Sequence, residues 1–367
     1  MLRLLPFALG YAYSYLLRSA GAPLAAPMAQ DLGLSPGSLG AINALFFLAF
    51  ALAQVPLGHV LERWGPSRTL AALLALAVLG CGLVAAAPSL ILLALGRAAM
   101  GVGVALALVG ALRAYQLLAP GRLGFLSGLT VALGGLGGLL ATWPLVRLGE
   151  VWGWRGAYGA LGVLALGLAL WVARASVGGK PGPGERGQEG RAVLGVGPLA
   201  LVSAVYVGAF FALQTFWVGA YAYARGFSGD QVGGLLALLN LASVLGAFAS
   251  GSLAAALGMR RALALGMGVF AAGLLAWGGG AGLGLAYLLV GFGGGFNGLV
   301  LAHTATLFPE ASSRAMAWVN LAGVVGIFAL QAGMGPLVEG LGYGGSLLAL
   351  FLLQAGAIAL LLLWRPR

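Results

Sequence analysis

Charged residues are scarce in this sequence. Asp, Glu, Lys and Arg make up only 7% of its 367 residues, whereas 61% are hydrophobic. A water-soluble domain of this length needs far more charge to cover its surface, so the soluble classes are excluded. The composition indicates a polytopic α-helical membrane protein.

Residues that carry chemistry are also few. The single cysteine, Cys81, excludes a disulfide within the chain. With two histidines, neither a nucleophile–His–acid set nor a cluster of metal ligands can be built. We therefore expect no enzyme activity, no catalytic residue, no metal site and no cofactor.

Long uncharged runs divide the chain into twelve candidate spans, because a helix needs about 20 mostly apolar residues to cross a bilayer. These runs are 4–28, 38–61, 69–87, 89–113, 123–146, 156–173, 196–224, 231–259, two spans within 262–309 divided at Gly278–Gly282, 315–338 and 343–364. The Gly- and Pro-rich stretch 176–195 reads as a flexible cytoplasmic linker. The prediction is an all-α fold of twelve transmembrane helices in two pseudo-symmetric six-helix bundles, 1–175 and 196–367.

An internal repeat supports this division. A shift of 193 positions aligns the pairs Ser35–Ser228, Gly40–Gly233, Gly58–Gly251, Gly65–Gly258 and Arg68–Arg261. Near the end of each half, Gly153–Tyr158 resembles Gly342–Ser346 with an offset of 189. The chain is therefore predicted to be a duplicated unit.

The basic residues are distributed unevenly between the two sides of the membrane. With both termini and the linker in the cytoplasm, fourteen Arg and Lys residues face the cytoplasm and three, Arg147, Arg155 and Arg225, face outside. This asymmetry predicts that orientation, in the inner membrane of a bacterial cell. It also explains the net charge of +11, so the bilayer is expected as a partner and nucleic acid is not.

The segment Gly58–Arg68 is a short charged stretch between two apolar runs. Its residues Gly58, Glu62, Arg63, Gly65 and Arg68 resemble the Gly-x-x-x-Asp-Arg-x-Gly-x-x-Arg loop after the second helix of the major facilitator superfamily, with Glu62 replacing Asp. The resemblance implies transport by alternating access. It also implies a gating role for these five residues, because in relatives the loop steadies the outward-facing state.

Arg18 lies within the first predicted span, and the i, i+4, i+7 spacing puts Tyr11, Tyr15 and Arg18 on one helix face. An arginine at membrane depth costs about 2.5–3.5 kcal/mol, so something must compensate for it. Either the guanidinium binds an anionic substrate beside the tyrosine hydroxyls, or it is structural and bonds helix carbonyls. The segments 15–18, 23–27, 31–35 and 54–58 resemble the organic-anion branches of the superfamily, in which a first-helix arginine commonly binds the anion.

Arg97, in the fourth predicted span, matches the family pattern Arg-x-x-x-Gly with Gly101. The resemblance implies a link to proton coupling, and a second anion contact or a structural role stay open. His303, in the tenth span, reads as either a packing residue or a proton carrier.

Acidic residues are absent from the middle of every predicted span. The eight acids are Asp31, Glu62, Glu150, Glu185, Glu189, Asp230, Glu310 and Glu339, each in a loop or at a helix end. Proton-driven drug exporters and sugar importers of this superfamily typically use a mid-span carboxylate, so an anionic substrate is favoured. The fifth span, with glycines from Gly128 to Gly138, also lacks the proline of the exporter pattern, and close helix packing explains it.

Uncharged polar residues in the second half complete the candidate site. Gln214 and Trp217 share a face of the seventh span, and Asn297 lies in the tenth. Asn240 and Gln331 also lie within spans, and such amides either bridge helices or line a pathway.

These observations predict a monomeric secondary transporter that moves a small organic anion of the mono- or dicarboxylate type, by proton symport. Two alternatives stay open, an efflux pump for apolar or drug-like compounds and a non-transporting membrane sensor on the same fold. Substrate identity and direction are not fixed by the sequence.

Overall fold

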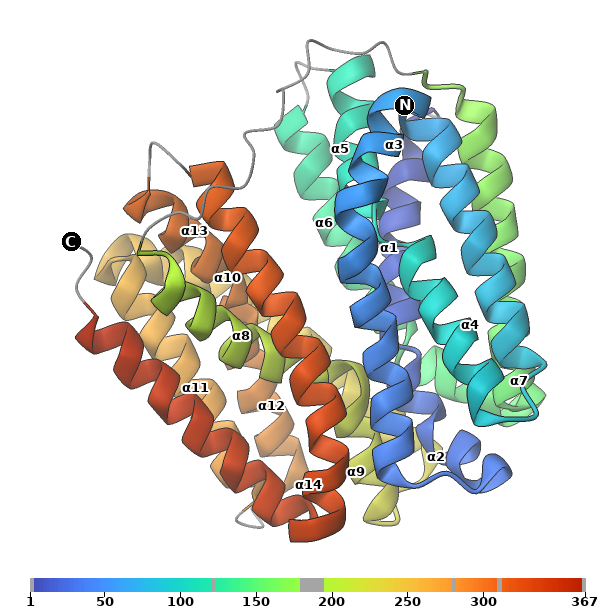
Figure 1. The fold of residues 1–367 in the computed structure, drawn as a ribbon. Coiled ribbons are helices and arrows are strands. Elements are labelled where there is room, and N and C mark those ends of the chain that lie inside the picture. Colours follow the sequence, from blue (N-terminus) through green and yellow to red (C-terminus); the bar gives the residue numbers. More distant parts are fainter. Residues whose placement is uncertain (1–2, 120–122, 179–194, 279–281, 309–311, 365–367) are drawn as a thin grey trace. The chain divides into compact units, whose positions relative to one another are not determined.

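The computed structural model describes residues 3–119, 123–178, 195–278, 282–308 and 312–364 (Figure 1). Within these residues every regular element is helical and no strand occurs, so the all-α prediction is confirmed. Residues 179–194, the main part of the predicted linker, lie outside the described residues.

The helices follow one another with short connections. Those of the first half are α1 (Leu5–Ser19), α2 (Gly21–Leu32), α3 (Pro36–Ala85), α4 (Leu90–Gly103), α5 (Ala107–Leu118), α6 (Leu123–Leu140) and α7 (Trp143–Ala175). Those of the second half are α8 (Gly197–Ala212), the π-helical turn η2 (Leu213–Trp217), α9 (Val218–Ala224), α10 (Gly229–Leu257), α11 (Met259–Gly278), α12 (Leu283–Gly294), the 3₁₀ turn η3 (Gly295–Asn297), α13 (Gly298–Leu307) and α14 (Ser312–Leu363). The division predicted at Gly278–Gly282 is confirmed.

Three of the longest helices each contain a chain reversal at a single glycine. Nine stretches of the described residues are long and apolar enough to cross a membrane. Dividing α3 at Gly65, α7 at Gly153 and α14 at Gly342, and joining the helices that continue one another, gives twelve spans in the described chain.

The reversal glycines confirm the repeat. Gly65 (φ 75°, ψ 167°) corresponds to Gly258 (φ 83°, ψ 151°), and Gly153 (φ 69°, ψ 168°) corresponds to Gly342 (φ 67°, ψ 176°). L-residues rarely adopt such positive φ values, so each reversal needs glycine. One expectation needs correction, because the segment Gly58–Arg68 is not an extended turn. Its first part stays helical up to the reversal at Gly65, since one glycine is enough to turn the chain.

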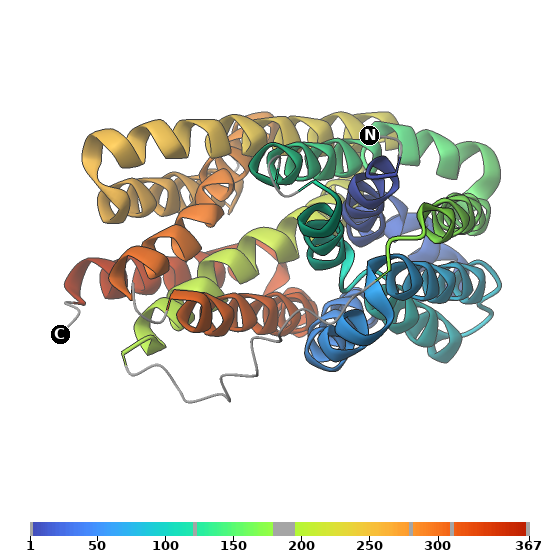
Figure 2. The same cartoon turned by 90° about the horizontal axis from the view of Figure 1, so that it is seen from above.

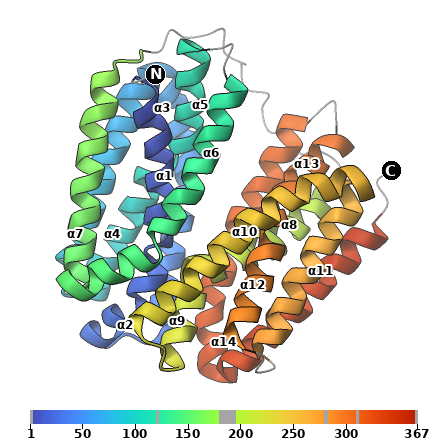
Figure 3. The ribbon, with the colours of Figure 1, turned by 180° about the vertical axis from the view of Figure 1, so that it is seen from behind.

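Close helix packing repeats in the same way. A Cβ atom on Gly137 of α6 would lie 1.9 Å from the carbonyl oxygen of Ala12 on α1. A Cβ atom on Gly326 of α14 would lie 2.0 Å from the carbonyl oxygen of Ala204 on α8. In Figures 1 and 3, α1 lies beside α6 and α8 lies beside α14. The glycines therefore let two backbones touch at corresponding places in each half, as the packing interpretation of the fifth span requires.

The chain forms two compact units. Unit 1 comprises Met1–Leu34 and Leu45–Arg186, and unit 2 comprises Ser35–Ala44 and Gly187–Arg367. Several helices of unit 1 are seen close to end-on in Figure 2, so they run roughly parallel. The first turns of α3 belong to unit 2, where the backbone N–H of Gly37 donates to Oε1 of Glu339 at 2.9 Å.

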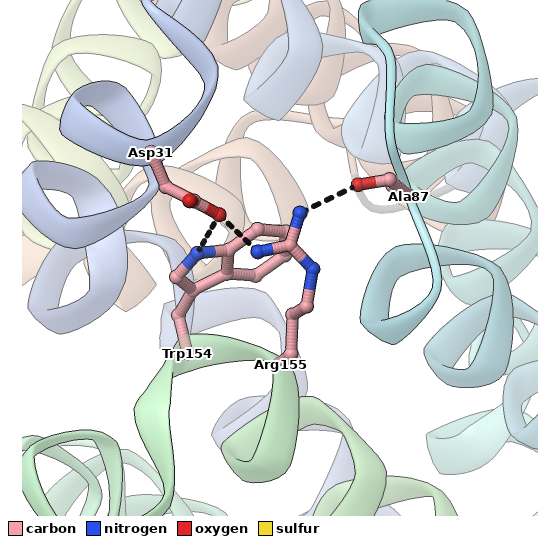
Figure 4. Close-up of polar contacts among 4 residues, drawn as sticks. All are labelled: Asp31, Ala87, Trp154 and Arg155. Atoms are coloured by element: carbon pink, nitrogen blue, oxygen red, sulfur yellow. Dashed lines mark hydrogen bonds and ion pairs between the residues drawn. The ribbon is translucent and has the colours of Figure 1, made fainter.

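A polar strap joins three elements of unit 1 at one end (Figure 4). Oδ2 of Asp31, at the end of α2, accepts hydrogen bonds from Trp154 Nε1 at 3.1 Å and from Arg155 Nη1. Nη2 of Arg155 donates to the carbonyl of Ala87, 3.0 Å away. The bond from Arg155 lowers the pKa of the Asp31 carboxyl below its ordinary value of 3.8. The strap therefore holds α2, the turn after α3 and α7 together.

Candidate functional site

Four of the described spans depart from α-helical geometry near their middle. These departures are Ala20 between α1 and α2, Val104–Leu106 between α4 and α5, the π turn Leu213–Trp217, and the 3₁₀ turn Gly295–Asn297. Pro23 accounts for the first, because it has no N–H for the carbonyl of Ser19. Non-helical backbone at membrane depth is tolerated only where it is buried in protein or lines a water-filled cavity. Each unit therefore holds two spans of the kind that transporters use around a binding site.

Arg18 lies in α1, one turn from the first break, and is half-buried. Its Nε donates to the Ser14 carbonyl and its Nη2 to Ser14 Oγ, both at 3.3 Å. A guanidinium has five N–H groups, so three of them donate to no described residue. No described carboxylate pairs with Arg18. The helix thus holds the cation in place and leaves most of its donors available.

Aromatic rings surround this guanidinium. Cζ of Arg18 lies 4.3 Å from the ring centroid of Tyr15 and 5.5 Å from that of Phe50 on α3. The Tyr11 hydroxyl donates to the Tyr15 hydroxyl at 3.5 Å, and the two rings pack edge to face. Such cation–π contacts contribute about 0.5–2 kcal/mol each. The structure brings Tyr11, Tyr15 and Arg18 together as their spacing predicts, and adds Phe50, for which the sequence carries no signal.

The helix opposite the tyrosines leaves room for their rings. A Cβ atom on Gly134 of α6 would lie 2.8 Å from Cε1 of Tyr11 and 3.2 Å from Cδ2 of Tyr15. Only glycine fits there without displacing a ring. Gly134 is therefore a positioning residue for the aromatic pair.

Arg97 lies in the packed interior of unit 1 and is only 1% exposed. Its Nη1 donates to the Tyr158 hydroxyl at 3.3 Å, and its Cζ lies 5.4 Å from the Phe46 ring. Both the second anion contact and the coupling role suggested for Arg97 remain predictions.

In unit 2, Gln214 and Trp217 lie on the π turn and are buried. Nε2 of Gln214 donates to Oδ1 of Asn240 at 3.0 Å, and Nε1 of Trp217 donates to the carbonyl of Gln331 at 3.1 Å. Both predicted residues therefore link η2 to neighbouring helices, and their contact with a substrate remains a prediction. π-Helical turns are rare and occur frequently at functional sites.

Gln331 is fully buried and incompletely paired. Its Oε1 lies 3.4 Å from the Thr215 hydroxyl, whereas its Nε2 has no hydrogen-bond partner. A buried polar group without a partner costs about 1–3 kcal/mol. This amide is therefore kept at a cost to stability that packing does not explain.

The remaining predicted site residues are placed as follows. Asn297 is half-buried at the end of η3, and its Nδ2 donates to the carbonyl of Gly294 at 3.0 Å. His303 is buried in α13, with no hydrogen-bond partner at Nδ1. Neither observation decides between packing and transport, so both assignments remain predictions.

The predicted gating residues lie on the surface of unit 1. Gly58 is partly exposed, whereas Glu62, Arg63 and Arg68 are exposed and form no ion pair with a described residue. Their gating role remains a prediction.

Ser67 stabilises the reversal instead. Its backbone N–H donates to the carbonyl of Val177 at 3.3 Å, and its Oγ accepts from the Val177 N–H at 2.8 Å. Nothing in the sequence distinguishes this serine, because its partner lies 110 positions away.

Twelve spans in two parallel repeats, each with broken helices at mid-membrane, define a multi-pass membrane transporter. The sequence pattern of the Major Facilitator Superfamily matches residues 7–330. The chain therefore belongs to this superfamily and is a transporter rather than an enzyme.

Similar proteins include two transporters of small anions. The chain is 29% identical over 156 residues to the probable sulfoacetate transporter SauU of Cupriavidus necator, covering 42% of this chain and 36% of that protein. It is 30% identical over 129 residues to the nitrate/nitrite transporter NrtP of Picosynechococcus sp., covering 35% of this chain and 24% of that protein. The chain thus spans about a third and a quarter of these relatives.

The fold is shared with solved structures over its whole length. A bacterial homologue of the human lysosomal transporter Spinster superposes with a TM-score of 0.79 at 16% identity, covering 99% of this chain and 98% of that one. At this identity the likeness shows the fold alone.

Proposed function

We propose that this chain is a secondary active transporter that moves a small organic anion, of the mono- or dicarboxylate type, by alternating access with proton symport. Its place is the inner membrane of a bacterial cell, with both termini in the cytoplasm, as the distribution of basic residues favours. A monomer is sufficient for this function, because each chain carries both repeats.

Arg18 is the observation that carries the proposal. It is a half-buried cation without a carboxylate partner in the described chain, and three of its N–H groups are available. A guanidinium cannot lose its proton, so an anion is the ligand that compensates it best. Its planar fork suits the two oxygens of a carboxylate or sulfonate.

The related transporters support the same class of substrate. Sulfoacetate, named for one relative, carries a carboxylate and a sulfonate, and nitrate, named for the other, is a planar oxyanion. Both ligands match the donor geometry of a guanidinium.

Other residues assist on this proposal. Tyr11 and Tyr15 flank the anion at Arg18, and Arg97 adds positive potential from the interior of unit 1. Gln214, Trp217 and Asn297 bind substrate in unit 2. The segment from Gly58 to Arg68 controls conformational preference.

Proton coupling is proposed to use the substrate or His303 as the proton carrier. The five acids of the described residues each lie within three positions of a helix end or reversal glycine, so no described carboxylate is placed at mid-span. A protonated acid carries its own proton through the site without a protein carboxylate.

A thermal-stability panel tests the proposal. Purified protein is heated with carboxylates, sulfoacetate, nitrate, sugars and cationic drugs, and a ligand that binds the folded state raises the unfolding midpoint. We expect shifts with organic anions that disappear in Arg18→Ala and persist in Arg225→Ala, which removes an exposed arginine. Shifts with cationic drugs alone would contradict the proposal.

A further inference from the structure

Four polar side chains from three helical segments of unit 2 form a connected group, the amide cluster. Its members are Gln214 and Thr215 on η2, Asn240 on α10 and Gln331 on α14. All four are buried, with at most 8% of any residue exposed. Hydrogen bonds or close polar contacts join Gln214 to Asn240 at 3.0 Å and Thr215 to Gln331 at 3.4 Å. None of the four carries a charge.

The hydrogen atoms available in the cluster do not satisfy Gln331. The Thr215 hydroxyl has one proton, and the carbonyl of Phe211 at 2.6 Å is its nearer acceptor. The end of the Gln331 amide that faces Thr215 is then the donating nitrogen, since the orientation of an amide is assigned from its hydrogen bonds. In either orientation, one end of this fully buried amide has no partner.

A second acceptor in the cluster is also available. Nε2 of Gln214 is used by Asn240, whose Nδ2 in turn donates to the carbonyl of Leu236 at 2.8 Å. Oε1 of Gln214 accepts no hydrogen bond from a described residue. The cluster therefore presents unused donor and acceptor positions beside the π turn, which is itself a geometry typical of functional sites.

The absence of charge in the cluster restricts what can bind. A carboxylate placed there would lose its hydration without an opposing charge, which is unfavourable. A hydroxyl group is neutral and can both donate and accept, so it fits the unused positions.

We infer that the amide cluster binds an uncharged hydroxyl group of the substrate, which makes the chain selective for hydroxylated carboxylates. This inference rests on the proposed function, because it names the substrate class of the same transporter. Gln331 is the specificity-determining residue, and Thr215 and Asn240 position the two amides.

Matched anion pairs test the inference. The dissociation constants of lactate and propionate, and of malate and succinate, are measured by thermal-shift titration of wild type, Gln331→Met and Gln354→Met. Gln331→Met is expected to fold, since replacing an unpaired buried amide with an apolar side chain of similar shape is nearly neutral. Gln354→Met is the matched control, because Gln354 is equally buried on α14 and its amide also has no partner.

We expect wild type to bind the hydroxylated member of each pair about 10-fold more tightly. Gln331→Met should remove this preference and leave the affinity for propionate and succinate unchanged, whereas Gln354→Met should keep the preference. Equal affinities in wild type would overturn the inference and show that the amide holds water only. A preference that survives in Gln331→Met would overturn the assignment to the cluster. If no carboxylate binds wild type, the proposed function itself fails.

Discussion

Gly134→Ala is a small change aimed at the aromatic support of Arg18. The new Cβ atom would lie 2.8 Å from Cε1 of Tyr11 and 3.2 Å from Cδ2 of Tyr15, where ordinary contacts begin at 3.4 Å. Because rings are rigid, the pair must move by several tenths of an ångström. Tyr15 then no longer lies at its place 4.3 Å from the guanidinium.

The size of the effect follows from two terms. Overpacking of this kind costs about 1–3 kcal/mol, offset by about 0.5–1 kcal/mol from replacing glycine within a helix. Stability should therefore fall by about 1–2 kcal/mol. Loss of about 1 kcal/mol of cation–π support for Arg18 should weaken anion binding about fivefold.

Gly323→Ala is the matched control, because Gly323 holds the corresponding place on α14. Its new Cβ atom would lie 2.7 Å from Oγ of Ser203 and 3.6 Å from Val207, and it faces no arginine. The assay is thermal unfolding together with titration of the best-binding carboxylate. Both variants should lose stability, and only Gly134→Ala should lose affinity. Wild-type affinity in Gly134→Ala would refute the positioning role.

Three further predictions concern the framework. Gly326→Ala would place a Cβ atom 2.0 Å from a backbone oxygen of α8 and should lower the unfolding midpoint by several degrees, whereas Gly159→Ala, with no atom within 4 Å, should not. The lowered pKa of Asp31 means that the strap stabilises the fold above pH 3.8 and that this contribution is lost as pH falls below it. The stability difference between wild type and Asp31→Asn should thus be full at pH 7 and shrink near pH 3. Ser67→Ala should cost about 1 kcal/mol and speed amide hydrogen exchange at Val177, and unchanged exchange there would contradict the assigned bond.

The features that the sequence predicts correctly depend on local requirements. A reversal with φ near +70° needs glycine, so Gly65 and Gly258 align in the sequence and turn the chain in the structure. The shared face of Tyr11, Tyr15 and Arg18 follows from the helical period alone.

The features that were missed depend on distant partners or on subtle backbone geometry. The bond between Asp31 and Arg155 joins residues 124 positions apart. The π turn at Leu213–Trp217 contains one extra residue per turn but no distinctive residue, so periodicity does not reveal it. Phe50 reaches Arg18 only through the packing of α3 against α1.

The two halves have kept their framework and changed their chemistry. A Cβ atom on Gly101 would lie 2.1 Å from the carbonyl oxygen of Phe46, and one on Gly291 would lie 2.2 Å from that of Leu239, so corresponding close contacts persist. By the correspondence of Ala12 with Ala204, the place of Arg18 is taken in unit 2 by an apolar residue, Phe210. Unit 1 therefore carries the positive charges of the candidate site, whereas unit 2 carries amides.

Calorimetric titration of one carboxylate into wild type, Arg18→Ala and Arg18→Lys tests the central claim most directly. The account predicts binding in wild type, weaker binding in Arg18→Lys, which keeps the charge without the planar fork, and no binding in Arg18→Ala. Equal affinity in all three proteins would show that Arg18 does not hold the anion and would contradict the account.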